Sequence, residues 1–167
     1  PKATILYAVE VPSEGGDTSF CNLRKAYAAL PIDTKKRLDG LQALHVYQSS
    51  RSPRKDQMVL SEEEKEATPD TVQPLVRFHV DAKAPNLFMS TTRLENIVGL
   101  PREESDTLVD TLFAHAEDPQ FHYHHKWRVG DLVFWDNSAT IHFACGGIKP
   151  PGVRKLHRTS IAGSVPY

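Results

Sequence analysis

Several residue types and patterns are scarce in this 167-residue chain. It has only two cysteines, Cys21 and Cys145, without Cys-x-x-Cys spacing or the density of a disulfide-stapled secreted domain, which favours a reducing cytoplasm. No apolar run approaches the ~20 residues that a membrane span needs. The formal net charge is -1, so neither nucleic acid nor an anionic membrane is expected as a partner.

The chain is long enough to bury one hydrophobic core, and we expect a single domain over residues 1–167. Strands are expected where β-branched and apolar residues gather, at residues 3–11, 41–47, 72–80 and 86–89. Helices are expected at residues 22–30, 33–38 and 101–116. The last is the clearest, because it starts with proline, continues with two glutamates and keeps its leucines on one stripe.

The C-terminal part of the chain carries the pattern most informative about function. Leu132, Val133, Phe134 and Trp135 form an apolar run typical of a buried strand, and His142 follows one short turn later. The Gly- and Pro-rich residues 145–152 can only form a loop. We expect residues 153–161 to return as a strand beside the first.

On that returning strand, alternate residues share a face, so Arg154 and Arg158 would point the same way. One imidazole, that of His142, and two guanidiniums would then project from adjacent strands. A neutral imidazole binds a transition metal, and a guanidinium can bind a carboxylate bidentately. The pattern indicates a site for a metal and a carboxylate-bearing small molecule, although a core histidine and a surface arginine are the simpler interpretations of each residue alone.

Three stretches together carry a family resemblance. They read ILYAVEVPSEGGDTSFCNLRKAYAALP near the start, LVRFHV with NLFMSTTRLENIVGLPREESDTLVDTLFAHAEDPQFHYHHKWRVGD in the middle, and GDLVFWDNSATIHFA with RKLHRTSIAG near the end. The chain resembles the taurine dioxygenase/2,4-dichlorophenoxyacetate dioxygenase family of Fe(II)- and 2-oxoglutarate-dependent oxygenases. The resemblance implies a mainly β fold, a double-stranded β-helix or jelly roll with helices packed outside.

The resemblance also implies an activity. A small, anionic organic substrate would be hydroxylated with Fe(II) as cofactor and 2-oxoglutarate and O2 as cosubstrates, and succinate and CO2 would be released. Such an enzyme would be cytoplasmic, and self-association into a homo-oligomer is left open.

Single residues receive roles from the same resemblance. His142 would be the distal iron ligand, Thr18 and Arg154 would bind the carboxylate of 2-oxoglutarate, and Arg158 would meet the anionic head of the substrate. In this family a His-x-Asp pair supplies the other two ligands, and the resemblance places that pair upstream of Pro1. We therefore expect a partial catalytic domain, incomplete at the N-terminus.

Two features of the sequence can each be interpreted in two ways. Taken without the resemblance, Thr18 lies in Asp17-Thr18-Ser19, which is cap chemistry for the helix at residues 22–30. Residues 49–71 are polar, rich in charge and longer than the ~15 residues usual for a loop. They are expected to form a lid over the substrate mouth, with a helical turn at residues 61–66, or else a solvated excursion.

Two other histidine pairs compete for a metal. His79-Val80-Asp81 would complete a triad of two histidines and one carboxylate with His142, but its polar surroundings favour the end of a hairpin. His122 and His124 share a strand face and are able to bind zinc, although that face is expected to be solvated. Three hypotheses follow: an active dioxygenase, an iron-free binding or structural fragment of that fold, and a zinc hydrolase that uses His122 and His124.

Overall fold

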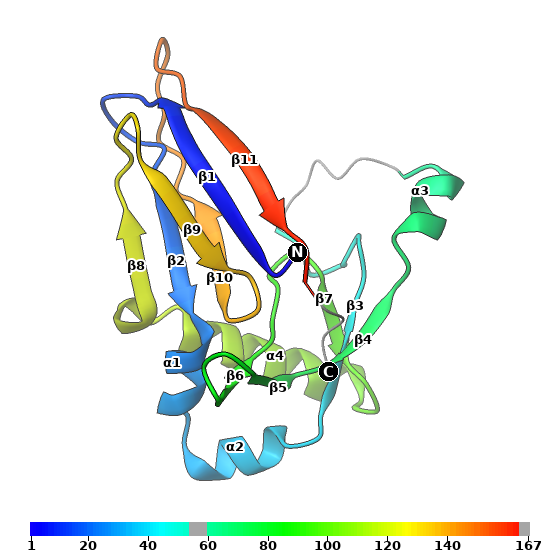
Figure 1. Cartoon of the computed structure of the whole chain (residues 1–167). Coiled ribbons are helices and arrows are strands. Elements are labelled where there is room, and N and C mark those ends of the chain that lie inside the picture. The colour runs from blue at the N-terminus through cyan, green and yellow to red at the C-terminus, as the bar shows by residue number, and fades with distance from the viewer. Residues whose placement is uncertain (54–59, 164–167) are drawn as a thin grey trace.

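The computed structural model describes residues 1–53 and 60–163, and a pair of facing antiparallel sheets forms one side of it (Figure 1). One sheet has the order β11-β1-β9 and the other β10-β2-β8. The first consists of β1 (Ala3–Glu10), β9 (Leu132–Asp136) and β11 (Lys155–Ile161). The second consists of β2 (Thr18–Asn22), β8 (His122–His125) and β10 (Thr140–Ala144). Aromatic rings meet between the sheets, since Phe20 of β2 lies 5.2 Å from Trp135 of β9.

The strand order corrects one expectation from the sequence. β11 does not lie beside β9, because β1 runs between them and pairs with both, so that Leu6 lies opposite Arg158 on one side and Val133 on the other. β10, which carries His142, belongs to the other sheet. The prediction that the imidazole and the guanidiniums project from adjacent strands is therefore wrong. His142 belongs to one sheet and Arg158 to the facing sheet, whereas Arg154 lies just before β11 and outside the strand.

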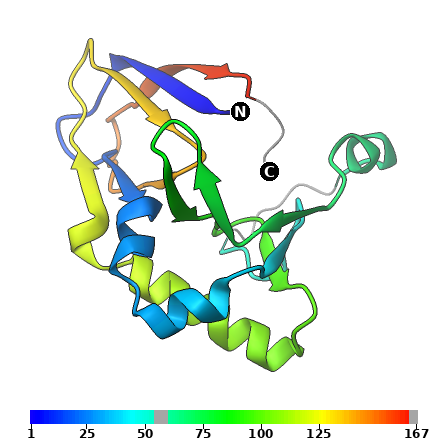
Figure 2. The same cartoon turned by 60° about the horizontal axis from the view of Figure 1, so that its bottom comes forward.

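A third sheet and a hairpin lie beside this pair of sheets. The third sheet has the order β4-β3-β7, with β3 (Gln42–His45), β4 (Thr71–Pro74) and β7 (Leu94–Ile97). The hairpin consists of β5 (Val76–His79) and β6 (Ala84–Leu87), and it stands between the facing sheets and the third sheet (Figure 2). The single strand expected at residues 72–80 is thus divided at Leu75, which is fully buried, and β7 was not expected.

The helices gather mainly at one end of the molecule. α1 (Leu23–Ala29), α2 (Ile32–Leu38) and α4 (Arg102–Ala116) lie at that end, whereas α3 (Glu62–Ala67) stands apart (Figure 1). The helices expected at residues 22–30, 33–38, 61–66 and 101–116 are confirmed. The expected cap is wrong, because Asn22 caps α1 by accepting from the backbone N–H of Lys25, and Thr18 and Ser19 belong to β2.

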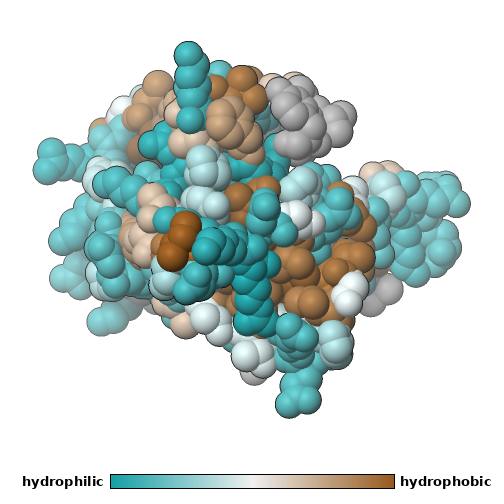
Figure 3. Space-filling model, turned by 90° about the horizontal axis from the view of Figure 1, so that it is seen from below, coloured by the Kyte–Doolittle hydropathy of each residue, from teal (hydrophilic) through white to brown (hydrophobic). Residues whose placement is uncertain are grey.

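The largest cluster of buried apolar residues joins these helices to the hairpin and to the third sheet. Its members include Leu23, Leu38, Leu75, Leu87, Ile97, Leu108 and Leu112. Truncating one such leucine to alanine costs about 2–5 kcal/mol. The surface at the helical end is largely hydrophilic, with hydrophobic areas between (Figure 3). None of the helices in residues 1–53 and 60–163 is both long and apolar enough to cross a bilayer.

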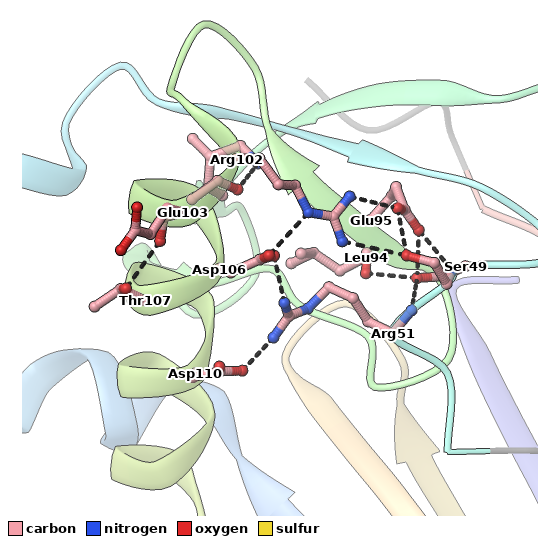
Figure 4. Close-up of polar contacts among 12 residues, drawn as sticks. Ser49, Arg51, Leu94, Glu95, Arg102, Glu103, Asp106, Thr107 and Asp110 are labelled. Carbon is pink, nitrogen blue, oxygen red and sulfur yellow. Dashed lines mark hydrogen bonds and ion pairs between the residues drawn. The ribbon is translucent and has the colours of Figure 1, made fainter.

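The start of the expected lid is fixed to α4 and β7 (Figure 4). Arg51 forms ion pairs with Asp106 and Asp110 of α4, and its side chain is only 17% exposed. Ser49 donates to the backbone carbonyl of Leu94 and to Glu95, at 2.9 Å in each case. Part of the expected lid, residues 54–59, lies outside the described residues.

Candidate active site between the two sheets

A cavity of about 690 Å³ opens beside His142. His142 reaches it from β10 and Arg158 from β11, and the hairpin contributes Arg77 and Asn86. His45, at the end of β3, lines it as well. Residues from all four sheets thus line the cavity, and they come from segments far apart in the sequence.

His142 is exposed toward this cavity while other rings pack on it. The centroid of its ring lies 4.7 Å from Trp135 and 6.0 Å from Phe20, the residue opposite it in β2. Burial lowers the pKa of His142, and the positive charge of Arg158 lowers it further. Both effects favour the neutral imidazole, which is the form that binds a metal.

Thr18 of β2 and Arg154, which lies just before β11, form a second polar centre. The Nη2 of Arg154 donates to the hydroxyl oxygen of Thr18 at 2.9 Å, and the indole N–H of Trp127 donates to that oxygen at 3.0 Å. A threonine hydroxyl has two acceptor lone pairs and one proton, so both lone pairs are engaged and the proton remains to be donated. Thr18 is 2% exposed. The Nε of Arg154 is buried, and no described residue accepts its proton.

These two donors fit an oxyanion. The O–H of Thr18 and the Nε–H of Arg154 both need an acceptor, and a carboxylate accepts several such bonds at once. Arg154 also lies 5.5 Å from the centre of the Trp127 ring, which holds the guanidinium in place through a cation–π contact. A carboxylate group of a small molecule would supply the missing acceptors.

The register of the sheet connects this centre with His142. Residue 142 lies opposite Phe20 and Ala144 lies opposite Thr18, so the side chains of His142 and Thr18 emerge on one face as diagonal neighbours. Such neighbours have Cα atoms about 7–8 Å apart. Thr18 and Arg154 do not line the cavity itself. On the side toward them, the cavity wall ends with His142 and Arg158.

A close contact between two loops holds Arg154 in position. The backbone N–H of Gly16 donates to the carbonyl of Gly146 at 2.7 Å, and Gly16 has φ +75°. A Cβ atom on Gly16 would lie 3.1 Å from the Cδ of Arg154. Glycine is required here both by the backbone conformation and by the nearness of the arginine stem.

The possible metal site has fewer candidate residues than the centre formed by Thr18 and Arg154. Residues 1–53 and 60–163 contain no group of three or more histidine, cysteine, aspartate or glutamate side chains that would hold a metal ion. Among these residues, His142 is therefore not part of such a group. The competing pair His79 and Asp81 is divided between two partners, because His79 contacts Asp136 at 2.8 Å and Asp81 pairs with Lys2 at 2.7 Å.

The other histidine pair is also engaged with the protein. The two ring nitrogens of His122 lie 3.0 Å from the hydroxyl of Ser19 and 2.9 Å from the carbonyl of Ala116. His124 contacts Asp17 at 2.9 Å. Each imidazole thus has its own partners, an arrangement that lends no support to a shared zinc ion.

The cavity wall contains residues for which the sequence alone predicts no role: His45, Arg77, Phe88 and Arg93. The segment LVRFHV contributes to the family resemblance and to the expected strand at residues 72–80, but Arg77 within it receives no role. Two arginines in and after short strands would have been a signal of a cationic wall, but nothing in the sequence shows that β3, β5 and the segment before β7 meet at one cavity.

Comparisons with known proteins identify relatives of this chain. The family model for the "Taurine catabolism dioxygenase TauD, TfdA family" matches residues 1–160. An alpha-ketoglutarate-dependent 2,4-dichlorophenoxyacetate dioxygenase of Cupriavidus pinatubonensis is 42% identical over 139 residues, which are 83% of this chain and 48% of that protein. An alpha-ketoglutarate-dependent sulfate ester dioxygenase of Pseudomonas putida is 33% identical over 99% of this chain and 56% of its own length. The chain spans about half the length of these relatives.

Solved structures show the same fold. A taurine dioxygenase from Burkholderia xenovorans superposes with a TM-score of 0.85 at 35% identity, over 99% of this chain and 54% of that one. The structure of AAD-2 in complex with Mn(II) and N-oxalylglycine gives 0.87 at 33% identity, over 99% of this chain and 64% of that one. The mainly β fold with helices is thereby confirmed. The family resemblance noted in the sequence is confirmed as well: the chain belongs to the TauD, TfdA family of dioxygenases.

Proposed function

We propose that this chain forms the greater part of the active site of an Fe(II)- and 2-oxoglutarate-dependent dioxygenase that acts on a small, anionic organic molecule. The observation that carries the proposal is the pair of unused donors on Thr18 and Arg154, with Thr18 on the same sheet face as His142. Family membership supports it, because the matched relatives are named as alpha-ketoglutarate-dependent dioxygenases.

Each residue has a separate task in this proposal. His142 supplies one iron ligand, and the remaining ligands come from a His-x-Asp pair outside residues 1–167. Arg154 and Thr18 bind the carboxylate of 2-oxoglutarate that is not next to the metal, and Trp127 keeps the Thr18 hydroxyl oriented. When bound, Fe(II) and 2-oxoglutarate supply the oxidation of a substrate C–H bond by O2, with release of succinate and CO2.

The cavity beside His142 holds the substrate. Arg158 lines the cavity and lies close enough to His142 for its charge to lower the pKa of that ring. No described carboxylate forms an ion pair with Arg158, so an anionic head group of the substrate would be its counter-ion. Such a contact fixes the distance between the anionic group and the C–H bond to be oxidised, which is how the protein selects the bond.

Iron-dependent formation of succinate from 2-oxoglutarate tests the proposal. His142→Ala is expected to abolish it and to lower the iron content. A matched control is His157→Ala, because His157 is an exposed histidine of β11 that does not line the cavity. Succinate formation that persists in His142→Ala would refute the assignment. Equal losses in both variants would trace the effect to folding and also count against the role of His142.

A lid is proposed for the segment after Arg51. Its support is the anchoring of Ser49 and Arg51 to β7 and α4, together with an α3 that has no buried residue. Removing α3 should then change the KM of the substrate and leave that of the cosubstrate unchanged. Finding both values unchanged would rule out the lid.

A further inference from the structure

A cluster of cationic and polar side chains lines the cavity in addition to His142 and Arg158. Arg77 belongs to β5, His45 ends β3, and Arg93 lies immediately before β7. The backbone carbonyl of Arg93 accepts from the N–H of Val46 at 2.8 Å, which fixes this part of the chain against the end of β3. Two of the three segments, which are distant in the sequence, are thereby held together at one wall.

Aromatic rings orient the two arginines. The guanidinium carbon of Arg77 lies 4.3 Å from the centre of the Phe88 ring, and that of Arg93 lies 4.7 Å from the centre of Tyr47. The ring of His45 packs 5.4 Å from Phe88. Cation–π contacts hold a guanidinium flat on a ring and leave its edge, with the N–H groups, for a hydrogen-bond acceptor.

Two of these donors, on His45 and Arg77, are buried and have no partner among the residues that the structure describes. His45 is only 8% exposed, and neither its Nε2 nor the Nε of Arg77 has a hydrogen-bond partner in that part of the chain. No described carboxylate forms an ion pair with Arg77 or Arg93. The charge of Asp136 does act on Arg77, but the oxygens of Asp136 are engaged by Ser138 and His79.

The electrostatics point the same way. Burial, followed by the charges of Arg93 and Arg77, lowers the pKa of His45 to about 4. The ring is therefore neutral at pH 7 and able to donate from Nε2 in one tautomer. Two positive charges face one neutral ring, and buried donors without acceptors cost stability unless a ligand supplies the acceptors.

We propose that Arg77, His45 and Arg93 form a second anion-binding subsite of the cavity, which takes an acidic group of a small molecule: a carboxylate, sulfonate or phosphate. Arg158 binds the anionic group near His142, so the preferred ligand is a small organic dianion with an acidic group at each end. This assignment of the ligand rests on the proposed function, since it places the substrate in this cavity. The binding of an anion by the subsite does not rest on the proposed function.

Inorganic phosphate is the first probe, because its binding needs neither iron nor turnover. At constant ionic strength, phosphate should raise the melting temperature of the protein, and Arg77→Gln or His45→Gln should remove most of that rise. Arg77→Lys keeps a stem and a charge but lacks the fork, and it should keep only part of the effect. The part of the phosphate-induced rise in melting temperature that depends on Arg77 should persist in Arg154→Gln and Arg158→Gln. The matched control is Arg128→Gln, an exposed arginine outside the cavity.

The second probe is a pair of acids that differ in one group, phenoxyacetate and 4-carboxyphenoxyacetate, with affinities measured by titration calorimetry. The dianion should bind about ten- to a hundredfold more tightly, the range expected for hydrogen bonds to charged groups. Arg77→Gln should abolish this advantage without changing the affinity for phenoxyacetate. Arg158→Gln should weaken the binding of both acids.

The outcomes separate the two proposals. Equal affinities for the two acids, together with a phosphate effect that Arg77→Gln leaves intact, would overturn the subsite even if the protein forms succinate from 2-oxoglutarate. A phosphate effect that is lost in Arg77→Gln, in a protein that forms no succinate, would uphold the subsite and refute the dioxygenase. If neither acid binds, the phosphate comparison alone decides. A phosphate effect that does not depend on Arg77 would then overturn the subsite.

Discussion

Arg158 and His142 line one cavity from two different sheets, and the charge of Arg158 adds to burial in lowering the pKa of His142. Removing that charge stabilises the imidazolium, so Arg158→Gln should raise the pKa of His142. An NMR titration of the metal-free protein measures it, with Arg128→Gln as the control. Because metal competes with the proton, the acid limit of metal binding should move to higher pH in Arg158→Gln. A His142 pKa that does not rise would show that Arg158 does not act on His142.

The position of Gly16 beside Arg154 predicts a measurable difference between two glycines. Gly16 and Gly40 have almost the same φ, +75° and +72°, but a Cβ on Gly40 meets nothing within 4 Å. Gly40→Ala should therefore cost only the backbone term, about 1–2 kcal/mol of unfolding free energy. Gly16→Ala should cost more and should also weaken 2-oxoglutarate binding, because its Cβ crowds the Arg154 stem. Identical losses of stability, with 2-oxoglutarate affinity intact in both variants, would contradict this.

The two cysteines should differ strongly in reactivity. Cys21 is buried, donates to the carbonyl of Ala116 at 3.3 Å, and has its pKa raised to about 11 by burial, whereas Cys145 is exposed. A thiol reagent at pH 7.5 should modify Cys145 in the native protein at least ~100-fold faster than Cys21, since the thiolate is the reactive form. Mass spectrometry of the labelled peptides measures both rates. Comparable rates would mean that β2 opens readily and that the buried position of Cys21 is wrong.

The attachment of residues 49–51 to α4 predicts a larger role for Arg51 than for Arg37. Both are ion-paired with α4, but the side chain of Arg51 is 17% exposed and meets two carboxylates, while Arg37 is 54% exposed and meets only Glu104. Arg51→Ala should lower the free energy of unfolding by about 1.5–3 kcal/mol and Arg37→Ala by about 0.2–1 kcal/mol. Chemical denaturation compares them. Equal costs would show that the network in Figure 4 stabilises the fold no more than the exposed pair of Arg37 does.

Local patterns predicted much of the secondary structure. The helix at residues 102–116 was predicted within one residue, because its leucine stripe and the glutamates of its first turn agree with each other. Asp17-Thr18-Ser19 misled for the same local reason. Its residues are good helix caps, but pairing with both β8 and β10 draws Thr18 and Ser19 into a strand. Strand pairing is a long-range property that a short window of sequence does not contain.

The sequence likewise predicted some parts of the candidate site and not others. His142, Thr18, Arg154 and Arg158 were chosen from motifs, and the structure brings His142 and Arg158 to one cavity and Thr18 and Arg154 into one hydrogen bond. The sheets that carry them were not predicted. The subsite around Arg77 was not predicted either, since it depends on the meeting of three distant segments.

The affinity for 2-oxoglutarate, measured anaerobically with Fe(II) in the wild type and in Thr18→Val, tests the central claim most directly. Valine keeps the shape of the side chain and removes its hydroxyl. If Thr18 and Arg154 bind the cosubstrate carboxylate, Thr18→Val should weaken 2-oxoglutarate binding about ten- to a hundredfold while the protein remains folded. An unchanged affinity in a folded Thr18→Val variant would contradict the account.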